Sequence, residues 1–516
     1  MKVARRHPDG SCPIAPAAQG GAWLRRRIRC AAWLRRRFAV DLRSLAAFRI
    51  AAGTILVVDA LLRVRDFPLM FTTDGIFPLA PLRQTWGADP AVWSLAFLVD
   101  HAWCGGLVLA VQGLAGLCLA CGWRTRAATI VAWAAQLSVM RRTLPATNAG
   151  DAWLGTLLFW SMFLPLGAVW SADAARRGAA GRAGSRTFSS ASIALVLQVL
   201  VVYLAAGLAK LNDTWLTGEA IGRALSIHDH GTSFGTWLAG AGWLLRPLTW
   251  GVLGIELLLP ALYLLFPRPR LRVAVACCFI LFHLAIQATM SVGLFAAIGI
   301  TAWLALLPGA VWQTPAAADA DPDPGRLPPL AAAACGLLLG CASIGFLHGV
   351  TPWQSRPLPA VVGVPLALCG LVQEWGMFGV VSPTEQWIQA PALLSDGRRV
   401  DLLRNGAPVG ADRPGGGFGS LPHHRWHKLA WLLPRPRFRL LAPHVAAALA
   451  RDWNARHGAD SRVESLEIRF VVEGIAAHAG QRHEQLLATW PDRGTEGRGN
   501  LDRFLDDAGS GPAAAR

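Results

Sequence analysis

The feature that most constrains this chain is a series of apolar runs, each long enough to cross a lipid bilayer. One of them covers residues 191–208 and ends just before Lys210, in the sequence VLQVLVVYLAAGLAKLNDTW at 196–215. Because about 20 apolar residues span the hydrocarbon core of a membrane, runs of this length predict transmembrane helices. Charged residues make up 16% of the chain, against about 25% in soluble domains. We therefore expect an all-α polytopic membrane bundle.

The hydropathy pattern predicts about nine transmembrane helices. Their approximate ranges are 43–63, 101–121, 127–144, 150–169, 189–211, 248–266, 273–290, 292–312 and 329–349. Arginines gather before the first range and between the second and third, fourth and fifth, and sixth and seventh; Arg141 and Arg142 are the exception. Basic loops of membrane proteins stay in the cytoplasm. This pattern predicts a multi-pass cell-membrane protein with a cytoplasmic N-terminus and a periplasmic or extracellular C-terminus.

The chain divides into five parts by composition. Residues 1–40 carry the block WLRRR twice and predict a basic cytoplasmic amphipathic arm. Residues 41–350 form the transmembrane domain, whose long outer connections, 64–100 and 212–247, are expected to fold over the outer mouth as interfacial or re-entrant helices. The apolar stretch 357–378 predicts an interfacial helix, with a tenth span as the alternative.

The last two parts differ from the bundle. Residues 380–490 read as a small α+β extracytoplasmic domain. Alternation around Asp396 and Gly397 indicates a hairpin, residues 442–457 an amphipathic helix and residues 463–472 a strand. Residues 491–516 are polar and glycine-rich, which predicts a disordered tail.

Two classes of function are excluded by the distribution of charge and cysteine. The net charge of +17 comes from the arm, the short loops and the C-terminal part, with no basic and aromatic stripe on a soluble module, so no nucleic-acid partner is expected. Most of the ten cysteines lie in apolar runs, where cysteine behaves as a small hydrophobe. The segment HHRWH at 423–427 has ligand-like spacing but lacks a convincing fourth ligand. We interpret it as a solvated basic surface and predict no metal site.

Several ionisable or polar residues lie inside the apolar runs, where they are costly unless they face a partner or a water-filled cavity. Arg49 and Asp59 are ten residues apart on the first predicted helix, so about 15 Å separates them along one face and they cannot pair directly. The alternative is that Arg49 snorkels inward while Asp59 lies near the outer mouth. Asn148 is a candidate helix cap, and Asp151 falls in the first turn after it.

Lys210 is the candidate on which we expect function to depend. It ends the fifth predicted helix at its outer side, and the alternative is a lysine that snorkels to the headgroups. Glu256 and His283 lie inside the sixth and seventh predicted helices. The topology also places Asp59, Arg142 and Asp151 on the outer side with Lys210, which predicts a shared polar cavity.

Four segments resemble one family. They are FRIAAGTILVVD at 48–59, GWRTR at 122–126, YLAAGLAKLNDTW at 203–215 and FHLAIQATMSVGLF at 282–295. Together they resemble the HTTM (horizontally transferred transmembrane) domain family, which includes vitamin K-dependent gamma-carboxylase, over roughly residues 41–312. Where the carboxylase has an Asn-His pair at the start of one span, this chain has Gly150 and Asp151.

The resemblance implies an activity and a cofactor. In the carboxylase a lysine that matches Lys210 deprotonates reduced vitamin K, and oxygen and carbon dioxide then react. For this chain the resemblance implies reduced vitamin K or a related quinol, membrane lipid, and an extracytoplasmic protein or peptide substrate. A desolvated lysine has a depressed pKa and can serve as a base. Two alternatives stay open: a non-enzymatic membrane protein that binds or exports a lipid-like ligand, and a structural role through the outer domain.

Overall fold

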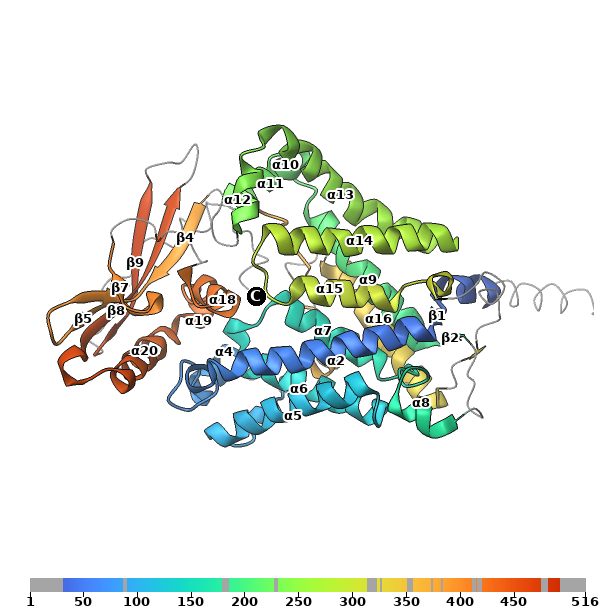
Figure 1. The fold of residues 1–516 in the computed structure, drawn as a ribbon, viewed down its shortest axis with the longest axis horizontal. Coiled ribbons are helices and arrows are strands. Elements are labelled where there is room, and N and C mark those ends of the chain that lie inside the picture. The colour runs from blue at the N-terminus through green and yellow to red at the C-terminus, as the bar shows by residue number, and fades with distance from the viewer. Residues whose placement is uncertain are drawn as a thin grey trace, which may run out of the picture.

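The computed structural model describes residues 31–86, 91–178, 185–226, 231–312, 323–324, 327–349, 356–372, 375–381, 384–410, 414, 420–474 and 481–491. Most of the predicted arm and almost all of the predicted tail lie outside the described residues. The described part consists of a helical bundle and, at one end of it, a C-terminal region with a β-sheet (Figure 1).

Each of the nine predicted spans contains one α-helix. These helices are α2 (Leu42–Val64), α5 (Ala102–Cys121), α6 (Thr125–Arg142), α7 (Ala149–Ser161), α9 (Ser190–Ala209), α13 (Gly242–Leu265), α14 (Pro269–Thr289), α15 (Phe295–Ala305) and α16 (Pro329–Gly349). Long apolar runs form helices here because a backbone in lipid must satisfy its own hydrogen bonds.

Six of these helices are long and apolar enough to cross a membrane. Among the described residues they are α2, α5, α9, α13, α14 and α16. Helix α6 carries three arginines, and α7 and α15 have 13 and 11 residues. The structure therefore supports a membrane-embedded bundle but not the count of nine, because three of the predicted runs form helices that are shorter or more polar than a full span.

Specific polar groups determine where the helices begin. Asp173 of α8 (Ala172–Arg177) accepts hydrogen bonds from the backbone N–H groups of Arg124 and Thr125 and so caps the start of α6. At the start of α7, the carboxylate of Asp151 accepts a 2.8 Å hydrogen bond from the backbone N–H of Asn148, and the two residues form a capping box. The predicted capping role of Asn148 and Asp151 is thus confirmed.

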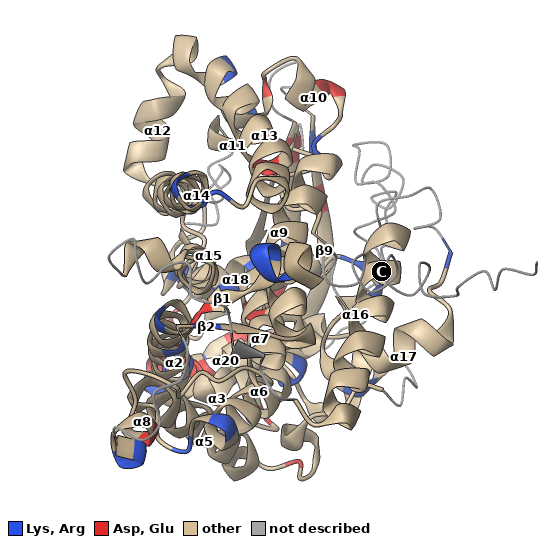
Figure 2. Cartoon of the chain, turned by 90° about the vertical axis from the view of Figure 1, so that its right-hand side faces the viewer, with Lys and Arg blue, Asp and Glu red and all other residues tan. Residues whose placement is uncertain are grey.

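The basic segments gather at the end of the bundle where α2 begins. Arg272 donates to the carbonyl oxygens of Arg36 and Arg37, and Arg37 donates to that of Leu265. Figure 2 looks onto this end and shows Lys and Arg on α8 and at the near end of α14. A short sheet of β1 (Val40–Asp41), β2 (Arg186–Phe188) and β3 (Asp323–Pro324) lies here as well. The basic loops therefore share one end, as the arginine pattern predicts.

The two long connections form short helices, as expected. The first contains α3 (Phe67–Met70) and α4 (Leu79–Trp86), and the second contains α10 (Asp213–Leu216), α11 (Ala220–Ser226) and α12 (Ser233–Ala239). Trp237 on α12 and Trp243 at the start of α13 are 66% and 79% exposed. Exposed tryptophans beside a candidate span are typical of residues at a membrane interface.

The C-terminal region is α+β. Its strands are β4 (Thr384–Gln389), β5 (Pro391–Leu394), β6 (Arg399–Asp401), β7 (Ala407–Pro408), β8 (Val463–Gly474) and β9 (Arg482–Trp490), and its helices are α18 (His424–Leu432), α19 (Pro436–Arg439) and α20 (Ala442–Arg456). The strands are antiparallel in the order β4-β8-β5-β6-β7, and β9 also pairs with β8. The predicted hairpin is present as β5–β6, with Gly397 at φ 82°.

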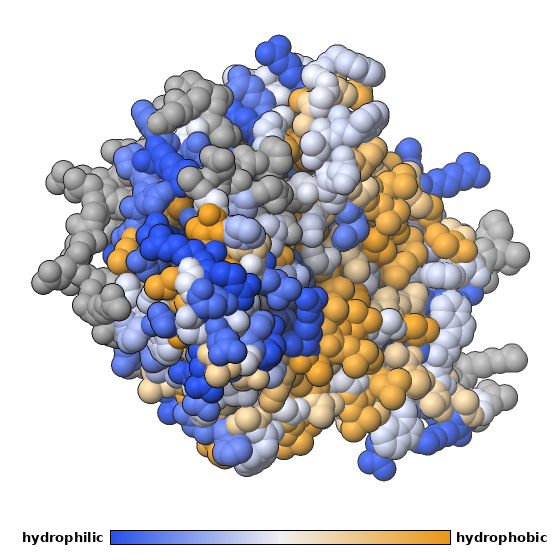
Figure 3. All heavy atoms as spheres, turned by 60° about the vertical axis from the view of Figure 1, so that its left-hand side comes forward, coloured by the Kyte–Doolittle hydropathy of each residue, from blue (hydrophilic) through white to orange (hydrophobic). Residues whose placement is uncertain are grey.

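The surface separates the two parts of the molecule. In Figure 3 the face of the bundle is mainly orange, that is hydrophobic, and the C-terminal region is mainly blue. This contrast follows from the exposed leucines and tryptophans of the bundle helices. The bundle therefore presents an apolar surface suited to lipid, and the C-terminal region presents a surface suited to water.

The predicted interfacial helix 357–378 is shorter than expected. Helix α17 covers Ala360–Cys369 and ends at Gly370, which has φ 66° and a left-handed conformation. Glycine in that conformation is a common helix terminator. The following residues, 375–379, run in an irregular segment that returns to the bundle.

The first prediction concerns the orientation of the two ends. In a variant without native cysteines, Ser395→Cys in the C-terminal region should react with an impermeant thiol reagent on intact cells. Ala175→Cys on α8 should react only after the cells are opened, because basic loops of membrane proteins usually stay in the cytoplasm. Both positions are exposed. Labelling of Ala175→Cys but not Ser395→Cys on intact cells would reverse the predicted orientation.

Candidate functional site

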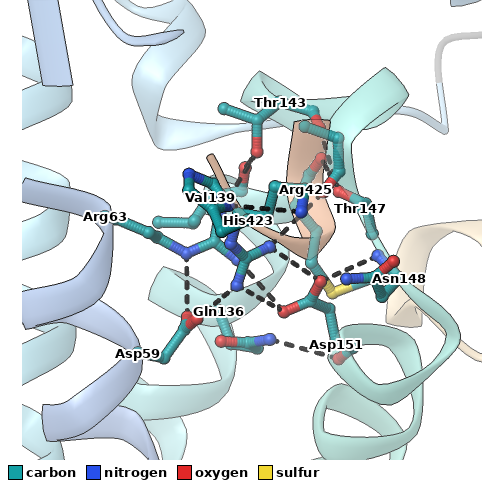
Figure 4. Close-up of polar contacts among 12 residues, drawn as sticks. Asp59, Arg63, Gln136, Val139, Thr143, Thr147, Asn148, Asp151, His423 and Arg425 are labelled. Atoms are coloured by element: carbon teal, nitrogen blue, oxygen red, sulfur yellow. Dashed lines mark hydrogen bonds and ion pairs between the residues drawn. The ribbon is translucent and has the colours of Figure 1, made fainter. Parts of the chain in front are cut away.

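Four charged side chains form a closed network between the bundle and the C-terminal region. Asp59 and Arg63 come from α2, Asp151 from α7 and Arg425 from α18, and all four are buried (Figure 4). Arg63 lies 2.8 Å from Asp59 and 3.1 Å from Asp151. Arg425 lies 3.0 Å from Asp151 and also pairs with Asp59. Each carboxylate therefore contacts both guanidinium groups, and the four charges cancel.

Local and distant sequence positions contribute to this network in different ways. Asp59 and Arg63 are neighbours on one helix face, four residues apart. Asp151 is held by its capping box at the start of α7. Arg425 is 366 residues from Asp59 in the chain, and the first turn of α18 brings it into place. Without Arg425 the bundle would hold two carboxylates and one guanidinium, so one negative charge would lack a partner.

Two glutamines extend the network into the bundle. The side-chain N–H of Gln112 donates to Asp59 at 3.1 Å and to the side-chain oxygen of Gln136 at 2.7 Å. Gln136 in turn donates to the backbone oxygen of Asp151 at 3.1 Å. These bonds fix the carboxylates further, as buried polar groups require. Asp59 is thus buried and paired, as its position in an apolar helix predicts.

The interpretation of HHRWH as a solvated surface is wrong. Arg425 and His427 are 3% and 4% exposed, and His423 pairs with Asp66, which lies between α2 and α3. Burial raises the pKa of the Asp66 carboxyl, but hydrogen bonds from His423 and Trp426 outweigh it and leave the pKa below its usual value. The buried carboxylates of the bundle were a signal that a cation must reach them. Nothing in the local pattern of HHRWH identified Arg425 as that cation.

Lys210 is buried beside a carboxylate. Lys210 is the C-cap residue of α9 and is 3% exposed. A side chain buried in this way does not extend to the lipid headgroups, which excludes the snorkelling alternative. The Nζ atom lies 2.8 Å from one oxygen of Glu256 and 3.1 Å from the other. It also donates to the carbonyl oxygens of Met377 at 3.0 Å and Ala206 at 3.4 Å. The ring of Trp215 lies 5.2 Å from Nζ.

A close approach of two helices and an irregular segment position Lys210. A Cβ atom at Gly207 would lie 2.8 Å from the side chain of Leu257 and 3.2 Å from the Cβ atom of Glu256, so the glycine allows α9 and α13 to pack closely there. Asn212 and Trp215 donate to the carbonyl oxygens of Gly379 and Phe378 at 2.7 and 2.8 Å. The segment 375–379 is therefore fastened over the end of α9.

His283 belongs to an aromatic cluster inside the bundle. Its Nε2 lies 2.7 Å from the hydroxyl of Tyr203, which accepts a 2.8 Å hydrogen bond from the indole N–H of Trp303. The ring of His283 packs over Gly299 and lies 6.0 Å from Trp153. Trp153 also contacts Trp375, at 5.9 Å between ring centroids, so this cluster reaches the segment that covers Lys210.

The charged side chains predicted to share one polar cavity fall into separate groups of contacts. Asp59 and Asp151 meet, but Lys210 pairs with Glu256 and Arg142 donates to the carbonyl oxygen of Phe77 at 2.6 Å. The observed pairs differ from the predicted group because helix packing, rather than depth in the membrane, decides which side chains touch.

Arg49 lies away from both charged clusters. It donates to the carbonyl oxygens of Leu119, Ala120 and Trp170 at 2.6–2.7 Å, where α5 ends. We assign Arg49 a structural role, because it satisfies carbonyl groups that a helix end leaves without partners.

Comparison with known proteins identifies one family. Residues 90–312 match the HTTM domain, and this segment includes Asn148, Asp151, Lys210, Glu256 and His283. The resemblance to the HTTM family inferred from the sequence is thereby confirmed for this part of the chain. Asp59, Arg63 and Arg425 lie outside the matched segment. No curated protein and no solved structure matches the chain.

The second prediction tests the charge balance of the network. Arg425→Met should lower the free energy of unfolding by about 3–5 kcal/mol, because it leaves a buried carboxylate without a partner. Adding Asp59→Asn to Arg425→Met should recover part of that loss, since one aspartate then faces one arginine. Thermal unfolding in detergent measures both effects, and Arg462→Met at an exposed position is the control. A double variant less stable than Arg425→Met would contradict the proposed balance of charge in the network.

The third prediction concerns pH. Burial first, and then the charge of Arg425, lowers the pKa of His424 from 6.5 to about 4. Between these values the unfolded chain binds the proton and the folded chain does not. Stability from this group is therefore full above pH 6.5 and falls as the pH drops toward 4, by up to about 3 kcal/mol.

The check is the unfolding temperature of wild type and His424→Gln between pH 4 and 7. The variant should lose stability less steeply over this range than wild type, and His483→Gln, at an exposed position on β9, should follow wild type. If the unfolding temperatures of wild type and His424→Gln fell equally steeply with pH, His424 would have the same pKa in the folded and unfolded states, which would contradict the prediction.

Proposed function

We propose that this protein, in which residues 90–312 match the HTTM domain, is an integral membrane enzyme that deprotonates a lipid-soluble quinol at Lys210. The observation that carries the proposal is the buried Lys210–Glu256 pair at the end of a candidate span, covered by the segment 375–379. Ionisable groups buried among membrane-spanning helices are candidates for a functional site. Reduced vitamin K or a related quinol is the substrate class that the family resemblance supplies.

The residues around Lys210 suit such a substrate. The ammonium group can hold an oxygen that gains negative charge, and the ring of Trp215 beside it offers an aromatic surface. Leu208, Leu211 and Leu216 at the end of α9 and on α10 are exposed. These side chains would give an apolar molecule a path from the lipid to Lys210. A carboxylase-like or oxygenase-like reaction of the deprotonated quinol is the outcome that we propose.

The proposal also includes the side of the membrane on which the site lies. In it Lys210 lies on the outer side of a cell membrane, and the C-terminal region is periplasmic or extracellular. Arg425 supports a shared position for the C-terminal region and the mouth of the bundle, because it joins them directly. An extracytoplasmic protein or peptide substrate would meet the site from that side.

One observation favours a second candidate, a non-enzymatic protein that binds or exports a lipid-like ligand. The three protons of the Lys210 ammonium have three acceptors: Oε1 of Glu256 and the carbonyl oxygens of Met377 and Ala206. A fully bonded ammonium is typical of a stable structural or anion-binding cation. The two candidates differ in whether Lys210 ever loses its proton.

The fourth prediction separates these candidates. Oxygen-dependent quinol turnover by purified protein should fall about 100-fold or more in Lys210→Ala, as loss of a general base does. Lys210→Arg should be equally inactive, because a guanidinium group does not deprotonate. Lys428→Arg, a substitution outside the site, is the control. Wild-type turnover in Lys210→Arg would contradict base chemistry at Lys210 and favour the ligand-binding candidate.

A further inference from the structure

We infer that Glu256 is the final proton acceptor of this site, acting through Lys210. In this scheme Lys210 gives one of its own protons to the Glu256 carboxylate and takes the proton of the substrate hydroxyl in its place. The inference rests on the proposed function and adds to it the group that makes the lysine available as a base.

The starting point is the protonation state of the lysine. An ammonium group has three N–H donors and no acceptor, and all three donors of Lys210 find acceptors. A neutral amine would turn its lone pair toward one of these oxygens. The geometry therefore describes a charged Lys210, which cannot act as a base until one proton leaves.

Among the described contacts of Lys210, one group can take that proton. The carbonyl oxygens of Ala206 and Met377 accept hydrogen bonds but are not basic enough to take a proton. The carboxylate of Glu256 is basic enough, and its Oε1 atom accepts a 3.1 Å hydrogen bond from Nζ. Glu256 is 5% exposed, so bulk water does not compete for this contact. The transfer needs no movement of either helix.

The transfer is balanced in atoms and in charge. One N–H bond of Lys210 breaks as an O–H bond forms on Glu256; the substrate O–H bond breaks as a new N–H bond forms on Lys210. Before the step the site holds an ammonium, a carboxylate and a neutral hydroxyl. After it the site holds an ammonium, a carboxylic acid and an oxyanion. The net charge is zero at both points, and no electron is transferred.

This conservation of charge matters because the site is surrounded by apolar helices. Charge brought into or left in such an environment without compensation is strongly disfavoured. A lone lysine would have to release its first proton to water before it could act. With Glu256 beside it, Lys210 instead keeps its positive charge next to the new oxyanion, where the attraction between them is strongest.

Infrared difference spectroscopy tests the inference without requiring turnover. Full-length protein in detergent is mixed with a short-chain naphthoquinol in the absence of oxygen. We expect a new carboxylic-acid C=O band that shifts in D₂O and is absent from Glu256→Gln. Bound quinol with no such band in wild type would overturn the role of Glu256. Absence of quinol binding would overturn the proposed function instead.

Turnover of variants gives a second test. Glu256→Asp keeps the carboxylate and should retain about a tenth or more of wild-type turnover, whereas Glu256→Gln should lose about 100-fold. Thermal unfolding of both variants separates this loss from misfolding. Turnover equal to wild type in Glu256→Gln would overturn the inference. Should that variant fail to fold, the infrared band of the wild-type protein decides the question.

Discussion

The structure depends on one constraint: a charge buried among apolar helices must have a partner. Burying an ion costs several kcal/mol unless an opposite charge and hydrogen bonds compensate. Six of the buried charges discussed here pair with an opposite charge, and Arg49 donates to backbone carbonyl oxygens instead. The seven charges are Arg49, Asp59, Arg63, Asp151, Lys210, Glu256 and Arg425. The helices can pack in few other arrangements, because most alternatives would separate at least one of these groups from its partner.

The same constraint joins the two parts of the molecule. The carboxylates of Asp59 and Asp151 outnumber the guanidinium of Arg63 within the bundle, and Arg425 from the C-terminal region supplies the missing charge. His423 pairs with Asp66 beside it. The C-terminal region is therefore held by buried charge at the end of the bundle and contributes to its stability.

Sequence alone predicted the elements of this fold better than their contacts. Apolar runs located the helices, the alternation around Gly397 located the β5–β6 hairpin, and the cap at Asn148 was read from local residue types. Such features depend on neighbours in the chain. Arg425 pairs with a residue 366 positions away, and Glu256 with one 46 positions away. No local pattern encodes such pairs, so the need for a partner could be predicted but not its identity.

The two charged clusters differ in the chemistry that they allow. In the network around Asp59 each carboxylate faces two guanidinium groups, and a guanidinium has no readily lost proton. That network is therefore a fixed structural element. In the other cluster a single carboxylate faces an ammonium, and a proton can pass between them without any change of net charge. The irregular segment 375–379 also contributes a backbone carbonyl to this pair. Proton chemistry in this bundle is thus expected at Lys210 and Glu256, while the network around Asp59 keeps the C-terminal region in place beside them.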